Sequence, residues 1–532
     1  MTMRKCRRGA ASSGLLMLAG LTALALLGVV LFRMGASNSP LPGQTNGQPS
    51  APLMLYCAAG LRAPIEQIAA DYRRETGVQV QLQFGGSNTL LSQIEIARTG
   101  DLFLAADDSY LDLAREKKLL REALPLATMR AVIVVPKDNP KQVSGLEDLL
   151  RPDVRTALAN PGQAAIGKVV REVLQSAGKW TDLEKAIVDR GVFQPTVSEV
   201  ANSVKVGAAD AGIVWNTTVF DQPDFAVINP PEFADAKGKV ALGVLEGSLQ
   251  PTAALQFGRY VTARDKGLTI FKKFGYEVID GDDWSLSPEL TFYCGSVNRR
   301  AVEPLIVEFE QREGVRVNTV YNGCGILVGQ MKVIADWRQG KGFPDTYMAC
   351  DRYYLDVVKD QFQDDVDISE TEVVIAVRKG NPQKIQNLND LVRHGLRVAV
   401  GQPQQCTIGV LTRNILKDEG IEGEVLKNVV AETCSSALLL PMVATGSVDA
   451  AMVYETDTRN AANDVDVIRI ASPAAKAIQP FSIARSSSHK WLSRRFFDTL
   501  ARHQDHFEAV GFRWKLDEAK PEEPIVKSEP QE

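Results

Sequence analysis

The sequence predicts an α/β protein made of two tandem copies of one large unit, each of them bilobed. Short apolar strands such as residues 131–136 alternate with helical segments, which favours a mostly parallel sheet flanked by helices. The tripeptide LYC at residues 55–57 returns as FYC at residues 292–294, and Cys324 stands 237 positions after Ser87, the same offset. A fixed offset over this length indicates an internal duplication.

The composition is that of a globular protein with ample material for a core. The chain has 532 residues, of which 45% are hydrophobic and 23% are charged. The net charge of −5 gives no basic surface for nucleic acid, so we expect no nucleic-acid partner.

The N-terminal segment, residues 1–34, predicts a membrane anchor. Four basic residues between Arg4 and Arg8 precede an uncharged, mostly apolar run at residues 14–32. As a helix this run would span roughly 28 Å, close to the hydrocarbon thickness of a membrane. The basic flank predicts a single-pass protein of the cell membrane with the bulk of the chain in the periplasm or outside the cell. A cleaved signal peptide is the alternative. Residues 35–52 read as a flexible tether.

The elements of the first unit, residues 53–278, follow from local patterns. Residues 78–84 alternate between apolar and polar side chains, as a half-buried strand does. Pro64 is tolerated in the first turn of a helix, and Gly77 suits the end of that helix. In chain order we expect strands at 53–57, 78–84, 101–107, 131–136, 158–160 and 213–215, and helices at 63–75, from 87, at 110–120, at 145–149 and from 166.

One turn, FGGSNTLLSQIE at residues 84–95, joins a strand to a helix start. Its two glycines let the backbone turn, and Ser87 is of a residue type that caps helices. Free backbone N–H groups and the positive end of a helix dipole at this point suit an anion. The alternative is an ordinary turn in which Ser87 only caps the helix.

On these and other segments the unit resembles the molybdate-binding proteins of bacterial ABC importers, which are periplasmic binding proteins of type II. The resemblance covers residues 53 to about 278 and, in the second copy, about 290 to 512; it rests on FGGSNTLLSQIE, GDLFLAADDSYLDLA, VVPKDNP, ANPGQAAIG, GAADAGIVW and GVLEGS. It implies lobes that close on a small oxyanion by a hinge. Molybdate is the expected ligand, with tungstate or sulfate as alternatives, and an ABC permease is the expected partner.

The resemblance also implies a set of ligand-binding positions in the first unit, namely Gly60, Ser87, Ile166, Val197 and Trp215. Ser87 would donate from its hydroxyl, Ile166 and Val197 from backbone N–H groups, and Trp215 from its indole N–H. Gly60 lacks the hydroxyl of the family, and Trp215 replaces a tyrosine, which bears on selectivity for molybdate. A fully ionised oxyanion needs donors only, and the site loops carry no Lys or Arg besides Arg62 just past the first. For Trp215, the alternative is a core aromatic residue.

The second unit, residues 290–512, follows a polar linker at 279–289 and is expected to be a diverged binder. Its matching positions are Val297, Cys324, Ile408, Ser436 and Tyr454, so the tyrosine returns and the serine becomes a cysteine. Cys324 and Cys406 lie on site loops and leave three possibilities open: a disulfide, a soft-metal site or buried structural thiols. The cysteine spacings match no zinc site, and we expect no metal or cofactor. Residues 513–532 are expected to be disordered.

Three functions compete. The first is capture of an oxyanion for import, and the second is a membrane-tethered anion sensor or scaffold with a degenerate second unit. The third is an enzyme with Cys324 or Cys406 as nucleophile. None of the four histidines lies in a site loop, so a Cys–His pair is hard to assemble and we expect no enzyme.

Overall fold

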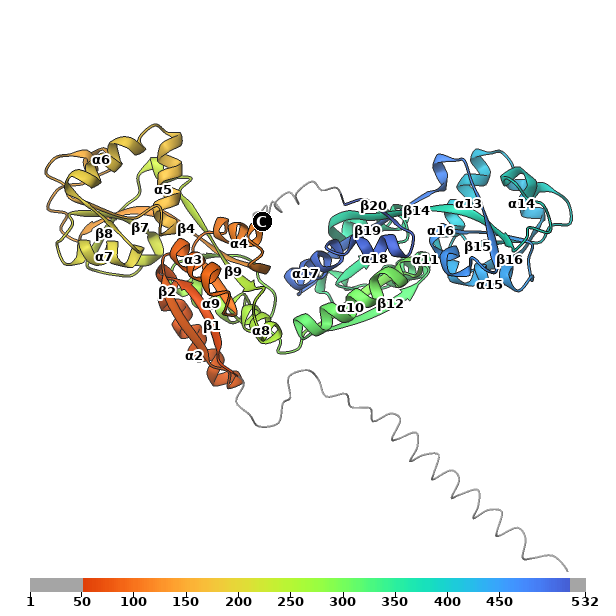
Figure 1. Ribbon diagram of the computed structural model, residues 1–532, viewed down its shortest axis with the longest axis horizontal. Coiled ribbons are helices and arrows are strands. Elements are labelled where there is room, and N and C mark those ends of the chain that lie inside the picture. Colours follow the sequence, from red (N-terminus) through yellow and green to blue (C-terminus); the bar gives the residue numbers. More distant parts are fainter. Residues whose placement is uncertain (1–50, 517–532) are drawn as a thin grey trace, which may run out of the picture. The chain divides into compact units, whose positions relative to one another are not determined.

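The computed structural model describes residues 51–516 and shows two α/β units that follow each other along the chain (Figure 1). The two tandem α/β units expected from the duplication are therefore confirmed. The expected anchor, nearly all of the tether and most of the tail lie outside the described residues. Within residues 51–516, no helix is both long and apolar enough to span a membrane.

The first unit has one strand path in the order β2-β1-β3-β9-β4-β7-β5-β6, with β8 and β10 paired to β4. One lobe contains β1, β2, β3, β9 and β10, and the other contains β5, β6, β7 and β8. The strands are β1 (Leu53–Ala58), β2 (Val80–Gly85), β3 (Leu102–Ala105), β4 (Leu120–Pro136), β5 (Thr156–Ala159), β6 (Val192–Gln194), β7 (Ala211–Trp215), β8 (Phe225–Ile228), β9 (Lys237–Leu245) and β10 (Glu277–Val278).

Helices flank both lobes of the first unit. They are α2 (Arg62–Thr76), α3 (Ser87–Ala97), α4 (Ser109–Glu116), α8 (Pro251–Val261) and α9 (Gly267–Lys273) in the lobe of β1, and α5 (Ala165–Ser176), α6 (Trp180–Arg190) and α7 (Val197–Lys205) in the lobe of β5.

The long strand β4 passes from one lobe to the other. Up to Arg130 it pairs with β9, and from Ala131 onward it pairs with β7. Both pairings are antiparallel, as is that of β3 with β9. The prediction of a mostly parallel sheet is therefore wrong, and the sheet is mixed. The reason is that the crossing strand runs through both lobes against its neighbours, which short apolar runs in the sequence do not reveal.

The second unit repeats this topology in the order β12-β11-β13-β19-β14-β17-β15-β16, with β18 and β20 paired to β14. The crossing strand is β14, which leaves β19 at Glu372 and joins β17 at Val373. The strands are β11 (Glu289–Gly295), β12 (Arg316–Asn322), β13 (Thr346–Met348), β14 (Phe362–Arg378), β15 (Val398–Gly401), β16 (Val429–Thr433), β17 (Ala450–Tyr454), β18 (Val465–Arg469), β19 (Lys476–Ala484) and β20 (Arg513–Trp514).

The helices of the second unit also match those of the first in order. They are α10 (Arg299–Glu313), α11 (Cys324–Lys332), α12 (Arg352–Asp356), α17 (Lys490–Ala501) and α18 (Gln504–Ala509) in the lobe of β11, and α13 (Thr407–Asp418), α14 (Glu422–Lys427), α15 (Leu439–Ala444) and α16 (Glu455–Thr458) in the other.

The duplication extends to individual hydrogen bonds. The Asp101 carboxylate accepts from the Met54 N–H at 2.8 Å and from the Ser248 hydroxyl at 2.6 Å. In the second unit Asp345 accepts from the Thr291 N–H and the Ser487 hydroxyl at the same two distances. Because each aspartate satisfies one strand N–H beside β3 or β13, the two copies retain the same polar contacts as well as the same topology.

Some expected elements differ in extent. The strand at 131–136 begins at Leu120, and the helix expected at 110–120 ends at Glu116. The helix expected at 145–149 is a short 3-10 turn, Glu147–Leu150. The residue at the N-cap of α3 is Gly86, and no side chain caps the helix. Ser87 is therefore the first residue of α3, and the alternative in which it serves only as a cap is not what the structure shows.

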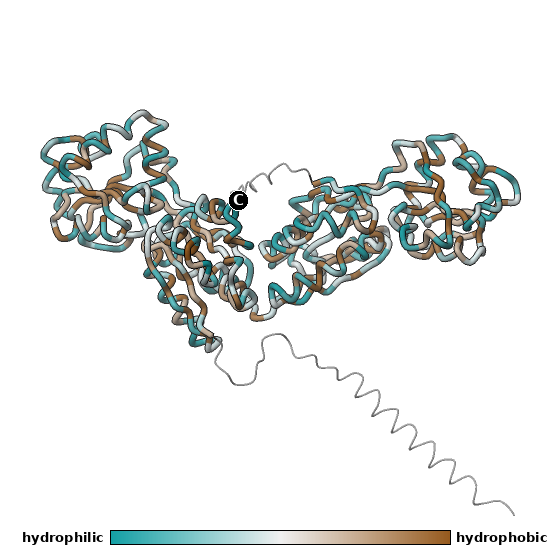
Figure 2. Tube along the Cα trace, viewed as in Figure 1, coloured by the Kyte–Doolittle hydropathy of each residue, from teal (hydrophilic) through white to brown (hydrophobic). Residues whose placement is uncertain are grey.

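Each unit has its own hydrophobic core, built on its central strands. Figure 2 shows hydrophobic residues along the strands inside the lobes. Residues Val132 to Val135 of β4 are fully buried, as expected for a strand that is covered on both faces. The cores hold the loops at the strand ends, where the candidate site lies.

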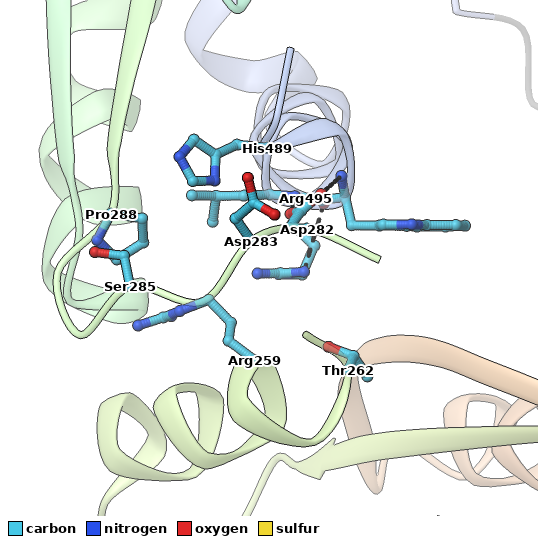
Figure 3. A pocket seen from close by; sticks show the side chains of 10 residues that line it. Arg259, Thr262, Asp282, Asp283, Ser285, Pro288, His489 and Arg495 are labelled. Atoms are coloured by element: carbon cyan, nitrogen blue, oxygen red, sulfur yellow. Dashed lines mark hydrogen bonds between the residues drawn. The ribbon is translucent and has the colours of Figure 1, made fainter. Parts of the chain in front are cut away.

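A buried ion-pair cluster lies beside the linker. Glu313 of α10 contacts Arg259 of α8 at 2.9 Å and Arg495 of α17 at 2.6 Å. Asp282 of the linker accepts from two backbone N–H groups at the start of α17, and with Arg259, Arg495 and others it lines a small cavity of about 20 Å³ (Figure 3). Glu313 is the carboxylate that contacts both buried arginines, so its loss would remove the ion-pair partner of each.

Candidate functional site

Three helices of the first unit begin beside one another in the cleft between the lobes. The N–H of Asn88 in α3 donates to the Gln163 carbonyl just before α5, at 3.0 Å. The hydroxyl of Ser198 in α7 donates to the Ala59 carbonyl at 3.4 Å, which joins the start of α7 to the turn after β1. The positive ends of three helix dipoles therefore meet between the lobes, which suits an anion.

The hydrogen-bond donors predicted from the sequence lie at these helix starts and do not donate to another group of the protein. Ser87 is buried, and its oxygen accepts from the Ala106 N–H at 3.3 Å, so its own O–H remains free to donate. Ile166 and Val197 are the second and first residues of α5 and α7. Within residues 51–516, their N–H groups have no hydrogen-bond partner. The arrangement therefore provides uncharged hydrogen-bond donors for a ligand that accepts hydrogen bonds.

Gly60 and Trp215 complete the predicted set, and the structure brings them together. A β-carbon on Gly60 would lie 3.6 Å from Cδ1 of Trp215, the atom next to the indole N–H. On its other side the indole faces Gly238, where a β-carbon would lie 3.0 Å from the ring. Trp215 is thus a buried aromatic residue, as the alternative held, and it also borders the turn that carries Gly60.

The lobes of the first unit are closed on each other. Besides the Asn88 backbone contact, the Asn88 side chain donates to the Gly162 carbonyl at 2.7 Å. A β-carbon on Gly86 would collide with the Gln163 carbonyl and lie 3.1 Å from the Pro195 carbonyl. Only glycine permits this close approach of the lobes, and the place of Gly86 in a Gly-Gly turn could have indicated this requirement.

Arg62, just past the first predicted loop, has partners of its own. Arg62 stacks its guanidinium 3.7 Å from the centre of the Phe84 ring and pairs with Glu66 at 3.2 Å.

At the start of α7, Thr196 and Glu199 form a capping box, with the Thr196 hydroxyl accepting from the Glu199 N–H. Sequence reasoning missed this box, although its T-x-x-E spacing is a recognisable signal. The box fixes the helix start that presents the Val197 N–H.

The corresponding residues of the second unit also meet across a closed cleft. The Gly325 N–H in α11 donates to the Gln405 carbonyl at 3.0 Å, and the Tyr354 hydroxyl donates to the Pro403 carbonyl at 2.6 Å. The predicted positions are all buried: Val297, Cys324, Ile408, Ser436 and Tyr454. The Tyr454 hydroxyl is buried and, among the described residues, has no hydrogen-bond partner. Polar groups therefore remain available in this cleft as well.

Of the three possibilities left open for Cys324 and Cys406, the structure does not show a disulfide between them, since both are buried free cysteines. The sulfur of Cys324 lies 2.9 Å from that of Cys350, while Cys406 contacts the carbonyls of Gln402 and Thr433. Burial raises the pKa of Cys406 to about 11. Cys350 was not singled out from the sequence, although it follows the repeated third strand at the place of Ala106. No group of three or more acidic, cysteine or histidine residues within residues 51–516 is arranged to bind a metal.

Two hollows lie outside the clefts. One of about 400 Å³ borders the hinge and is lined by Arg130, Asn229 and Lys237 among others. The second is the small cavity of Figure 3. Neither is lined by a predicted site residue, so neither hollow extends the candidate site.

Comparison with known proteins shows the family. The family described as bacterial extracellular solute-binding protein matches residues 53–277 and, a second time, residues 290–513. The chain belongs to this family. One relative of this solute-binding protein is the molybdate-binding protein ModA of Mycobacterium tuberculosis, 30% identical over 233 residues, which cover 43% of this chain and 85% of the relative. ModA of Escherichia coli is 26% identical over 234 residues, which cover 42% of this chain and 89% of the relative.

Among solved structures, the periplasmic molybdate-binding protein of Azotobacter vinelandii is 19% identical. The match covers 42% of this solute-binding protein and 98% of that chain, with a TM-score of 0.38. The two ModA matches cover 85% and 89% of the relatives but only 43% and 42% of this chain, so each of these relatives corresponds to one unit.

Proposed function

We propose that the first unit binds a small, fully ionised oxyanion between its lobes and that the protein delivers it to an ABC permease. Molybdate is the foremost candidate, with tungstate and sulfate as alternatives. Membership of the solute-binding family and the molybdate-binding relatives support this proposal. We further propose that the protein acts outside the cytoplasm, held at the membrane by residues 1–34, and that it is not an enzyme.

The observation that carries the proposal is that uncharged hydrogen-bond donors without an acceptor lie close together. The hydroxyl of Ser87 and the N–H groups of Ile166 and Val197 lie at three helix starts that meet in one cleft. Such groups stabilise an anion by hydrogen bonds and helix dipoles without a full counter-charge. A ligand that carries a proton at neutral pH would need an acceptor; the two backbone N–H groups supply none, and the Ser87 oxygen already accepts from Ala106.

The test is calorimetric titration of the chain with molybdate, tungstate, sulfate and phosphate. We expect heat with the first three and weak or no binding of phosphate. Titration of Ser87→Ala and Cys324→Ala variants assigns the heat to one unit, since only Ser87→Ala is expected to weaken it. The absence of heat with every oxyanion would contradict the proposal, and a preference for phosphate over sulfate would show that the site contains a proton acceptor.

A second candidate function is a membrane-tethered anion sensor or scaffold. The observation in its favour is that Cys324 and Val297 replace Ser87 and Gly60, so the second unit departs from the donor set of the first. Deletion of the gene distinguishes the two functions. Loss of oxyanion uptake supports transport, whereas normal uptake with an altered transcriptional response to the oxyanion supports sensing.

A further inference from the structure

Three positions of the second unit differ together from their counterparts in the first. Cys324 stands at the position of Ser87, Cys350 at that of Ala106, and Gly295 at that of Ala58. In the first unit the Ala106 N–H donates to the Ser87 oxygen; in the second, the Cys350 N–H donates to the Cys324 sulfur at 3.1 Å. The backbone contact is thus retained, while both side chains have become thiols.

Gly295 is what lets the two thiols lie together. A β-carbon at this position, as Ala58 has in the first unit, would lie 2.8 Å from the Cys324 sulfur and would collide with the Cys350 sulfur. The two sulfurs are 2.9 Å apart and both cysteines are buried. A β-carbon here would crowd both sulfurs at once, so the three residues form one arrangement, a dithiol.

The sulfurs need little movement to bond. A disulfide bond is about 2.05 Å long, so an approach of under about 1 Å is sufficient. Cys324 is the first residue of α11 and Cys350 follows β13, and both lie in the same lobe because β11 pairs with β13. Bonding therefore requires no motion between lobes.

Cys324 is the better nucleophile of the pair. Burial opposes its ionisation, but hydrogen bonds from Cys350, together with Thr407 and Tyr347, lower the pKa of the Cys324 thiol. Burial raises the pKa of Cys294 and Cys406, so these neighbours remain protonated. A thiolate at a helix N-terminus is the usual attacking group in thiol–disulfide exchange.

We propose that Cys324 and Cys350 are a redox-active dithiol that closes to an intramolecular disulfide by exchange with a disulfide oxidant. The Cys324 thiolate attacks one sulfur of the oxidant and releases the first thiol. The Cys350 sulfur then loses its proton and attacks Cys324, releasing the second thiol. The protein dithiol loses two electrons and two protons, and the oxidant disulfide is reduced to two thiols. This inference concerns the second unit and does not depend on the anion bound by the first.

The closed cleft controls access to the dithiol. The Gln405 carbonyl of the opposite lobe accepts from the N–H groups of Gly325 and Ile326, the two residues that follow Cys324. A β-carbon on Gly325 would collide with the Gln404 carbonyl, which shows how closely this loop covers the start of α11. Exchange therefore takes place when the lobes open, and closure protects whichever redox state has formed.

The test uses the full chain, first reduced and then equilibrated with oxidised glutathione, alkylated under denaturing conditions and analysed by mass spectrometry. We expect one disulfide, between Cys324 and Cys350, with Cys294 and Cys406 alkylated. Cys324→Ser and Cys350→Ala restore the residues of the first unit and should each abolish it; Cys406→Ser is the control that should retain it. Recovery of both cysteines as free thiols from folded, oxidised wild type, or pairing of Cys324 with Cys406 or Cys434, would overturn the proposal.

A second variant tests whether Gly295 is needed for the close approach of the two sulfurs. Gly295→Ala is expected to lose at least tenfold in the rate of disulfide formation, because its methyl group separates the sulfurs. Gly329→Ala in α11 is the matched control, since no heavy atom lies within 4 Å of its added carbon. Circular dichroism verifies that both variants are folded. An unchanged rate in a folded Gly295→Ala variant would contradict the role of the three-residue arrangement.

Discussion

The Cγ1 atom of Val197 lies 3.0 Å from the point where a β-carbon on Gly60 would stand. The second unit has Val297 and Ser436 at these positions, so a larger residue on the turn is matched by a smaller one at the helix start. This exchange predicts that Gly60→Val alone destabilises the first unit by about 1–3 kcal/mol through overpacking. Adding Val197→Ser should recover part of that loss.

A double-mutant cycle by urea unfolding measures this coupling. We expect the double variant to be more stable than the sum of the two single effects by about 0.5–3 kcal/mol. Strict additivity would show that residues 60 and 197 do not constrain each other.

Removal of the Ser87 hydroxyl should weaken oxyanion binding. Ser87→Ala deletes one donor at the start of α3, and we expect the affinity to fall by about 1–3 kcal/mol, roughly 5- to 150-fold. Calorimetric titration with molybdate measures it. Thr89→Ala is the control, because it removes an exposed hydroxyl from the same helical turn. Equal affinities for the two variants would show that Ser87 donates nothing to the ligand.

A side chain at Gly86 should hold the lobes of the first unit apart. In Gly86→Ala the added carbon meets the carbonyls of Gln163 and Pro195, which belong to the opposite lobe. We expect a larger radius of gyration by small-angle scattering in the presence of ligand, and an affinity lower by about 1–3 kcal/mol. Gly145→Ala, where the added carbon has no neighbour within 4 Å, should change neither quantity.

Neutralising Glu313 should destabilise the protein strongly. Glu313→Gln removes the carboxylate that contacts both Arg259 and Arg495, which are buried, and we expect a loss of about 3–5 kcal/mol in the free energy of unfolding. Glu303→Gln is the control on the same helix: its pair with Arg299, at 3.0 Å, is exposed and should be worth less than about 1 kcal/mol. Urea unfolding compares the two, and similar losses would show that the buried cluster does not stabilise the fold.

The carboxyl of Asp457 should make the stability of the second unit depend on pH. Burial raises its pKa from 3.8 to about 6, against the lowering effects of Arg300 and Ser436. Because the folded state holds the proton more tightly than the unfolded state, this stabilisation is complete below about pH 4 and is lost as the pH rises through 6. Asp457→Asn should therefore be more stable than wild type above pH 6, by roughly 1–3 kcal/mol.

Thermal unfolding of both proteins between pH 4 and 8 checks this expectation, and the difference should vanish toward pH 4. Asp466→Asn is the control: its carboxyl is hydrogen-bonded to Lys379, which holds its pKa below the usual value, so no gain is expected. A stability difference that does not vary with pH would mean that Asp457 is ionised in the folded state.

Local patterns were sufficient for much of the fold. Alternation predicted the strand that ends at Phe84, and helical spacing predicted the helix that follows it. The same patterns could not show that the strand at 131–136 begins at Leu120 and crosses between lobes, because residues 120–130 gain their strand partners from β9 and β10, more than a hundred residues away. Pairing of that kind is a property of the folded chain, and it turned the expected parallel sheet into a mixed one.

The sequence by itself determined the tandem duplication, the alternation of strands and helices, and the residue types at the turns. These features depend only on the order of neighbouring residues and on a repeat at a fixed offset. Only the tertiary structure decided which groups meet: that the Ser87, Ile166 and Val197 donors share one cleft, and that Cys324 lies beside Cys350 and not Cys406. The physical reason is that a site depends on the distances between loops at separate strand ends, and those distances are fixed by the packing of the cores beneath them.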